Sequence, residues 1–250
     1  MCYNNPIIPG LTLAEGGAIL HYQVRLMTQD DVIQVTEIDR EAFPTQWPPA
    51  NYQHELRNRL ANYVVAYDED STVDQPEAGA TAAKSQKRWF SGLGRLFGHD
   101  RAPDKNPPPP SRHYTVGFAG FWVMADEAHI TSIAVRESHR RRGIGELLLI
   151  SALDLAREKR ARLVTLEVRV SNAAAQKLYV KYGFNHVGMR RGYYIDRDEN
   201  YAETKEDGLI MSTRSIASDA FQAQLRHLKQ AYSRKWGTTL PGSAANSQSG

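Results

Sequence analysis

The chain has 250 residues, of which 41% are hydrophobic and 24% charged, and its formal net charge is +3. This composition excludes a disordered polymer, a collagen-like repeat and a disulfide scaffold. The small net charge gives no reason to expect direct binding of nucleic acid. The single cysteine, Cys2, excludes an intramolecular disulfide and a cysteine-based metal cage. No stretch has the pattern of a signal peptide or a membrane span, so we expect a cytoplasmic protein.

Composition divides the chain into a single interrupted domain with extensions. We expect residues 1–21 to be an N-terminal extension and residues 22–213 to be the domain, interrupted by a disordered insertion at 68–112 that is poor in aliphatic residues. Without the insertion the domain has about 147 residues, a typical size for one domain. Residues 214–236 read as an amphipathic helix, and 237–250 as a polar, disordered tail.

Alternating hydrophobic periods inside the domain predict an α/β fold with a mixed sheet and helices on both faces. In chain order the expected elements are a strand at 22–26, a helix after Thr28, a helix around 52–60, strands at 63–67, 114–124 and 129–135, a helix at 143–159, a strand at 163–170, a helix at 172–182, and strands at 184–194 and 209–212. The segment 195–208 reads as a long acidic connection, either an acidic rim that favours a basic peptide or a solvated loop.

An arginine- and glycine-rich turn separates the strand at 129–135 from the next helix, with the sequence Arg140-Arg141-Arg142-Gly143-Ile144-Gly145. Two glycines let the backbone bend closely round a ligand, and the free N–H groups of a first helical turn attract anions. The pattern indicates a pyrophosphate site, and the alternative is a solvated basic helix start.

The strand at 163–170 alternates apolar and polar residues, with Glu167 on the face opposite Leu166 and Val168. A carboxylate on a sheet is rigidly held, which suits a general base, although it can also be a surface carboxylate paired with a cation. In the following helix, Tyr179 falls on the apolar stripe, where core packing is its default role. Farther on, Arg190-Arg191-Gly192-Tyr193-Tyr194 can be a strand end with two aromatic rings on opposite faces.

Together these segments resemble the GNAT acetyltransferase superfamily. The strand Ile133-Ala134-Val135, the turn RRRGIG and the segment LEVRVSNAAAQKLY occur in the order and spacing of that superfamily, and LEVRVSNAAAQKLY with RRGYY is similar to the ribosomal-protein-alanine N-acetyltransferases. The similarity covers 22–213 without the insertion. It implies a GNAT-like acyl-CoA N-acyltransferase fold that uses acetyl-CoA and needs no metal.

The resemblance also implies roles for individual residues. Cofactor-binding positions are Ile133, Ala134, Val135, Arg140, Arg141, Arg142, Gly143, Ile144, Gly145, Glu146 and Asn172. Glu167 matches the family's general base and Tyr179 its general acid. Tyr193 and Tyr194 match residues that line the groove for the substrate peptide.

The expected reaction is transfer of an acetyl group to the N-terminal α-amino group of a protein, an alanine of a small ribosomal subunit protein in particular. An α-amino group has a pKa about 2.5 units below that of lysine, which makes deprotonation easier by roughly 3.5 kcal/mol. A single carboxylate therefore suits an N-terminus better than a lysine. The alternatives are a lysine or small-molecule amine as acceptor, and a non-catalytic acyl-CoA-binding or ribosome-associated module.

Two accessory segments carry apolar faces. Residues 87–97 are basic and amphipathic, which allows weak contact with a membrane surface but is more typical of a linker. The helix at 214–236 places Phe221, Leu225 and Tyr232 on one side. That side can dock on a partner such as the ribosome, although packing on its own domain is the expected arrangement.

Overall fold

The structure is a computed structural model, and it describes residues 22–45, 50–73, 112–197, 202–238 and 240. Seven strands form one sheet in the order β1-β2-β3-β4-β5-β7-β6. Neighbouring strands are antiparallel except β4 and β5, which are parallel. The strands are β1 (Tyr22–Leu26), β2 (Ala61–Val73), β3 (Arg112–Met124), β4 (Glu127–Val135), β5 (Leu163–Arg169), β6 (Phe184–Arg197) and β7 (Glu203–Thr213).

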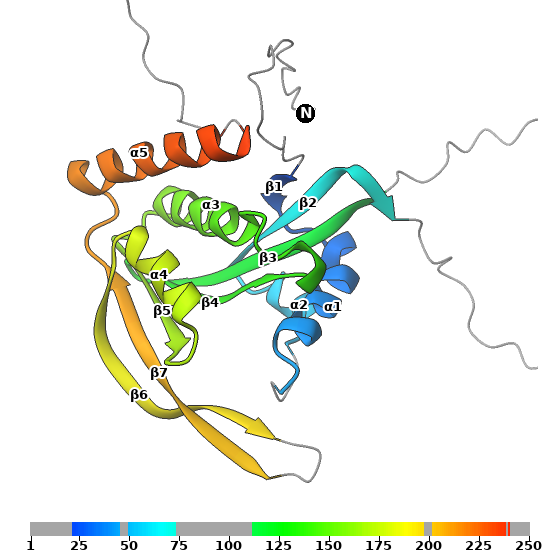
Figure 1. The fold of residues 1–250 in the computed structure, drawn as a ribbon, viewed down its shortest axis with the longest axis horizontal. Coiled ribbons are helices and arrows are strands. Elements are labelled where there is room, and N and C mark those ends of the chain that lie inside the picture. The colour runs from blue at the N-terminus through cyan, green and yellow to red at the C-terminus, as the bar shows by residue number, and fades with distance from the viewer. Residues whose placement is uncertain (1–21, 46–49, 74–111, 198–201, 239, 241–250) are drawn as a thin grey trace, which may run out of the picture.

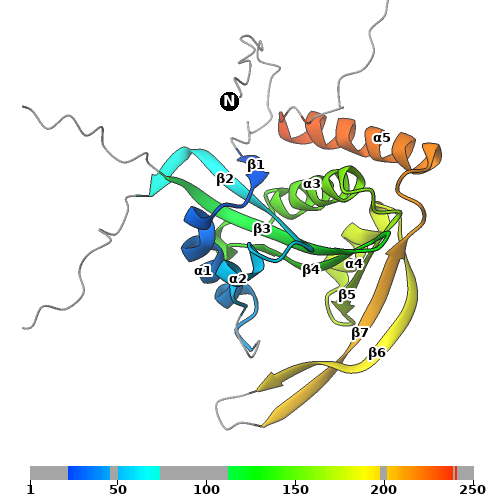
Figure 2. The ribbon, with the colours of Figure 1, turned by 180° about the vertical axis from the view of Figure 1, so that it is seen from behind.

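Helices cover both faces of the sheet (Figures 1 and 2), which confirms the predicted mixed α/β fold. They are α1 (Val32–Ala42), α2 (Tyr52–Glu55), α3 (Ile144–Glu158), α4 (Ala173–Lys181) and α5 (Asp219–Trp236). α1 and α2 lie on one face, and α3 and α4 lie on the other, with α5 beyond α3. The helix expected around 52–60 is a single turn, α2, because the chain turns at Leu56 and enters β2 at Ala61.

The apolar residues divide into two cores, one on each face of the sheet. The larger core packs α3 against the sheet and includes Leu148, Leu153 and Leu166, each at most 1% exposed. The smaller core packs α1 and α2 against Val65 and Phe118, which are fully buried. The side chains of a strand alternate between the two faces of the sheet. Leu166 lies in the larger core, so its neighbour Glu167 lies on the face covered by α1 and α2.

The expected boundaries of the insertion are wrong at both ends. β2 continues to Val73 and β3 begins at Arg112, so 68–73 and Arg112 belong to the sheet. Asp68 pairs with Tyr22 on one side and Tyr114 on the other. Strands pair through backbone hydrogen bonds, which do not require apolar side chains where a strand is exposed to solvent. A polar composition was therefore a poor guide to the boundaries of the insertion. Residues 74–111, including the amphipathic stretch 87–97, lie outside the described residues.

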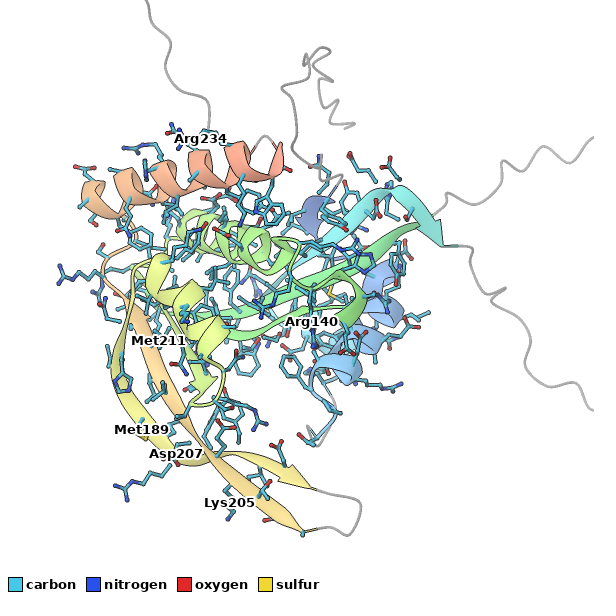
Figure 3. The ribbon with its side chains drawn as sticks, viewed as in Figure 1. Arg140, Met189, Lys205, Asp207, Met211 and Arg234 are labelled. Carbon is cyan, nitrogen blue, oxygen red and sulfur yellow. The ribbon has the colours of Figure 1, made fainter. Side chains whose placement is uncertain are left out.

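The segment 195–208, expected to be an acidic connection between two strands, is largely part of the strands themselves. β6 runs to Arg197 and β7 starts at Glu203, so most of this segment forms the end of a β-hairpin. Figure 3 labels Met211, Asp207 and Lys205 along β7, from the part beside the sheet to the projecting end of the hairpin. Asp196, Glu203, Glu206 and Asp207 are therefore held on strands.

The C-terminal helix packs on its own domain, as the apolar pattern predicted. Ser218 caps α5 by accepting a hydrogen bond from the N–H of Phe221. Phe221, Leu225 and Tyr232 are at most 9% exposed and join the larger core. Thr238 and Leu240 are buried as well, so the described part of 237–250 belongs to the fold and corrects the expected start of the tail. Residues 1–21 and 241–250 lie outside the described residues, within which no helix is long and apolar enough to cross a membrane.

Candidate active site

The parallel strands β4 and β5 separate partway along their length. Their pairing covers only Glu127–Ile130 against Leu163–Leu166, while the rest of β4 stays paired with β3 alone. Ile133, Ala134 and Val135 lie in the separated part, so their backbone groups on the β5 side take no part in the described ladder. The resemblance to the acetyltransferases implies that these three residues bind the cofactor, which stays a prediction.

The turn before α3 has the geometry of an anion site. Arg141 and Gly143 both adopt left-handed backbone conformations, with φ of 65° and 80°. The N-cap, Gly143, has no side chain to satisfy the first N–H groups of α3, and α3 begins at Ile144. Arg140, Arg141 and Arg142 are exposed around this turn, and Figure 3 labels Arg140 between β4 and α3. Free N–H groups at a helix start together with arginines fit a bound pyrophosphate.

Trp236, at the end of α5, packs directly on this turn. A Cβ atom added to Gly143 would lie 2.6 Å from the indole ring, far inside van der Waals contact. Glycine is therefore required at this position both by φ and by packing. The C-terminal helix thus fixes the shape of the turn, a link that the sequence alone does not reveal.

Two other expected cofactor residues already have structural partners. The Glu146 carboxylate accepts hydrogen bonds from Lys181 and, at 2.7 Å, from the Tyr182 hydroxyl, which ties the start of α3 to the end of α4. Burial, followed by the bond to Glu146, raises the pKa of Tyr182 well above its usual value. Asn172 accepts a hydrogen bond of 3.1 Å from the N–H of Ala175 and so caps α4. A contact of Asn172 with the cofactor stays a prediction.

Glu167 lies on the opposite side of the sheet from α3, and its side chain is only 6% exposed. Its Oε1 atom forms an ion pair with Arg190, whose Nε atom lies 2.9 Å away. Its Oε2 atom lies 3.1 Å from His129 Nε2. The carboxylate is therefore held between two groups of different kinds, a permanently charged guanidinium and a titratable imidazole.

The imidazole of His129 belongs to a longer chain of polar groups. Its Nδ1 atom lies 3.0 Å from the Thr165 hydroxyl, which in turn donates a hydrogen bond to Glu127. The parallel register places His129 beside Thr165, two residues before Glu167 on β5. Four side chains from two strands thus form a continuous line, Glu167–His129–Thr165–Glu127.

Tyr179 is half-buried on α4, with its ring centroid 5.6 Å from that of Phe184. Burial raises the pKa of its hydroxyl to about 12. The hydroxyl accepts and donates no hydrogen bond within the described part of the chain. Its position on the apolar stripe agrees with the prediction, and its role as an acid stays a prediction.

Tyr193 and Tyr194 are brought together at a β-bulge. Gly192 has a φ of 58°, and its N–H donates a hydrogen bond of 2.7 Å to Asp207. The two tyrosine rings meet edge to face, with centroids 5.0 Å apart, so the expectation of opposite faces is wrong. A regular strand would have separated them, and the register shift between Arg190 and Tyr194 removes that alternation.

Three of the candidate residues lie close together on β5 and β6. Burial raises the pKa of Tyr194 above its usual value, and the charges of Tyr193, Glu167 and Tyr179 raise it further. Arg190, which pairs with Glu167, also lies 5.3 Å from the centroid of the Tyr193 ring, and that ring meets Tyr194. The structure therefore brings Glu167, Tyr193 and Tyr194 together, from β5 and β6.

An ionic network holds the hairpin beside this group. Arg169 pairs with Asp196 at 2.7 Å and with Glu206 at 3.0 Å, and its guanidinium lies 4.4 Å from the centroid of the Tyr194 ring. Thr45, beyond the end of α1, donates a hydrogen bond to Asp196. The segment after α1 and the hairpin are thereby joined.

An open groove occurs elsewhere, between β1, α3 and α5, and Tyr22, Ile150, Lys229 and Leu240 contribute to its lining. It lies on the α3 side of the sheet, whereas Glu167 faces α1 and α2. Among the described residues there is no group of three or more His, Cys, Asp or Glu side chains that could hold a metal ion.

Local sequence patterns do not mark His129, Thr165 or Arg169 as functional residues. His129 was only the first residue of an expected strand, and its role depends on which residue of β5 lies beside it. Parallel register is set by tertiary packing over a separation of 36 residues, so no local pattern reports it. The one available signal is the alternation on β5, which places Thr165 and Glu167 on the same face.

The mixed sheet, the separated strands and the glycine turn before α3 agree with the class of protein that the sequence resembles, the N-acetyltransferases. Residues 110–184 match the profile of the Acetyltransferase (GNAT) family. The chain belongs to this family, since it is 31% identical over 193 residues to the N-alpha-acetyltransferase of Sulfurisphaera tokodaii, with 76% of this chain and 96% of that protein covered.

Two further relatives are named for a ribosomal substrate. The [ribosomal protein bS18]-alanine N-acetyltransferase of Salmonella typhimurium is 41% identical over 148 residues, which cover 57% of this chain and 92% of that protein. The crystal structure of the ribosomal-protein-S18-alanine N-acetyltransferase from Escherichia coli shares the fold, with a TM-score of 0.53 at 22% identity, covering 79% of this chain and 97% of that one.

Proposed function

We propose that this enzyme transfers the acetyl group of acetyl-CoA to the α-amino group of a protein N-terminus, and that its acceptor is the N-terminal alanine of ribosomal protein bS18. The observation that carries the proposal is the meeting of Glu167, Tyr193 and Tyr194 around Arg190. The names of the Salmonella and Sulfurisphaera relatives support an α-amino acceptor.

Enzymes of this family take the acetyl group from acetyl-CoA. The arginine turn and the uncapped start of α3 would hold its pyrophosphate, and the opening between β4 and β5 would admit the thioester. In the proposed arrangement, backbone groups of Ile133, Ala134 and Val135 line that opening. The bound cofactor supplies an activated acetyl group, and this chain supplies position and proton transfer.

Glu167 is the proposed base. A protein N-terminus is mostly protonated at neutral pH, and its ammonium group must lose a proton before it can attack a carbonyl carbon. A carboxylate on a rigid strand, in a site with little exposure, is well placed to accept that proton. Arg190 keeps one carboxylate oxygen occupied, so the oxygen nearer His129 is the proposed acceptor atom.

Tyr179 is the proposed acid for the leaving thiolate. With a pKa of about 12, its hydroxyl is about 3.5 units less acidic than a thiol of ordinary pKa near 8.5. Complete proton transfer from Tyr179 is therefore uphill by on the order of 5 kcal/mol. Tyr179 is accordingly expected to stabilise the thiolate by a hydrogen bond, a smaller contribution than that of Glu167.

A peptide panel tests the acceptor. Thiol release and mass spectrometry would compare a peptide with a free N-terminal alanine, the same peptide with a blocked N-terminus and one internal lysine, and a small amine. Acetylation of the free N-terminus with little reaction of the other two supports the proposal. Preferential reaction of the lysine or the small amine would show that the proposed acceptor is wrong, and no turnover at all would contradict the enzymatic proposal.

A further inference from the structure

We propose that His129 receives the proton that Glu167 removes from the acceptor amine, and that Thr165 and Glu127 stabilise the resulting imidazolium. This inference rests on the proposed function, because it describes what happens to the proton after Glu167 has accepted it. It gives a role to His129, Thr165 and Glu127, which nothing else in the mechanism uses.

The surroundings of Glu167 leave few ways for it to lose a proton again. Its side chain is 6% exposed, which restricts direct exchange with bulk water. Arg190 binds Oε1, and a guanidinium has donors only, so it cannot accept a proton. His129 Nε2 lies 3.1 Å from Oε2 and belongs to the one residue type that ordinarily gains and loses a proton near neutral pH.

The far side of the imidazole is prepared for a positive charge. An imidazolium donates from both nitrogens, and both nitrogens of His129 have a partner. Nε2 faces the Glu167 carboxylate, while Nδ1 faces the Thr165 hydroxyl at 3.0 Å. Since that hydroxyl donates its own hydrogen to Glu127, its oxygen is free to accept from Nδ1. The ring is thus set between two carboxylates, one in direct contact and one through a hydroxyl.

The proton balance is simple. One N–H bond of the ammonium group breaks and an O–H bond forms on Glu167; that proton then moves to Nε2 of His129, which restores the carboxylate. His129 is 24% exposed, so it can return the proton to water before the next turnover. The second proton of the amine is lost when the amide forms and ends on the departing thiolate, so that one proton is released to water and one is carried by the thiol.

Three variants of the full-length protein, His129→Gln, Thr165→Val and His129→Ala, distinguish proton transfer by His129 from a packing role. His129→Gln keeps a hydrogen-bonding side chain that cannot take up a proton. We expect it to lower kcat about 10-fold or more, because acid–base groups typically contribute 100-fold or more and Glu167 remains. The peptide KM and the acetyl-CoA Kd should change less than twofold. Thr165→Val, which removes the partner of Nδ1, should give a smaller loss in kcat.

Chemical rescue supplies the readout that a packing role would not produce. His129→Ala leaves a partly exposed space, and added imidazole should restore part of kcat in a saturable manner. The rescue should be larger at pH 8 than at pH 6, because only neutral imidazole accepts a proton and its ordinary pKa is about 6.5. His227→Ala is the matched control, since this histidine is exposed on α5, and it should show neither loss nor rescue.

The outcomes are distinguishable from those for the acceptor. The three variants are measured on whichever amine the wild-type enzyme acetylates in the panel, so an incorrect acceptor does not decide the role of His129. Loss of kcat with imidazole rescue supports the inference. A His129→Gln variant with wild-type kcat, or a His129→Ala variant that binds acetyl-CoA normally but is not rescued by imidazole, would overturn it.

Discussion

Replacing Gly143 by alanine tests whether the end of α5 shapes the cofactor turn. A non-glycine residue at a φ of 80° costs roughly 1–2 kcal/mol. The new Cβ would lie 2.6 Å from the Trp236 ring, and overpacking of this kind costs about 1–3 kcal/mol. Gly143→Ala should therefore lower the free energy of unfolding by about 2–5 kcal/mol, measured by urea denaturation.

The two contributions can be separated by a double-mutant cycle with Trp236→Ala. In the Trp236→Ala background only the backbone cost remains, so Gly143→Ala should then cost about 1–2 kcal/mol. The double variant should be more stable than the sum of the single losses by about 1–3 kcal/mol. Additivity within about 0.5 kcal/mol would refute the contact between α5 and the turn.

The same variant tests the assignment of the turn to the cofactor. A displaced Gly143 moves the N–H groups at the start of α3, which are the proposed donors to pyrophosphate. Gly143→Ala should weaken acetyl-CoA binding at least about 10-fold in a calorimetric titration, equivalent to about 1.4 kcal/mol. Unchanged affinity in a folded variant would show that the turn does not hold the cofactor.

Two more predictions concern the α1 region and the hairpin. Burial opposes ionisation of Asp31, but hydrogen bonds from Arg25 and Thr28 outweigh it and lower the pKa. A carboxyl group whose pKa is lower in the folded than in the unfolded protein stabilises the fold at pH values above its unfolded pKa. This stabilisation is lost as the pH falls through the folded pKa. Asp31→Asn should thus cost about 1–3 kcal/mol at pH 7 and progressively less below about pH 4 in urea titrations; a pH-independent difference would contradict this. Arg169→Met should raise the peptide KM several-fold by freeing Tyr194 and Asp196, with the acetyl-CoA Kd unchanged as the control.

Local patterns in the sequence predicted much of the site. The alternation on β5 correctly separated Glu167 from Leu166 and Val168, and the helical spacing on α4 correctly placed Tyr179 on its apolar stripe. The glycine turn was correctly expected between a strand and a helix. Each of these features depends on residues close together in the chain, which is why a period or a motif reports it.

Features that depend on distant pairings were missed or misplaced. The line from Glu167 to Glu127 requires the parallel register of β4 and β5, and the contact of Trp236 with Gly143 requires α5 to dock. The polar residues at 68–73, 195–197 and 203–208 form strands because neighbouring backbones satisfy their hydrogen bonds, whatever their side chains prefer. Composition therefore predicted an insertion and a loop where the sheet continues.

A comparison of Glu167→Gln with Tyr179→Phe tests the central claim most directly. The claim is that removal of a proton from the acceptor amine by Glu167 limits the chemistry, with Tyr179 helping a leaving group that needs less assistance. In single-turnover reactions at saturating acetyl-CoA and peptide, Glu167→Gln should slow acetyl transfer about 100-fold or more, and Tyr179→Phe distinctly less. Equal losses, or a larger loss for Tyr179→Phe, would contradict the account.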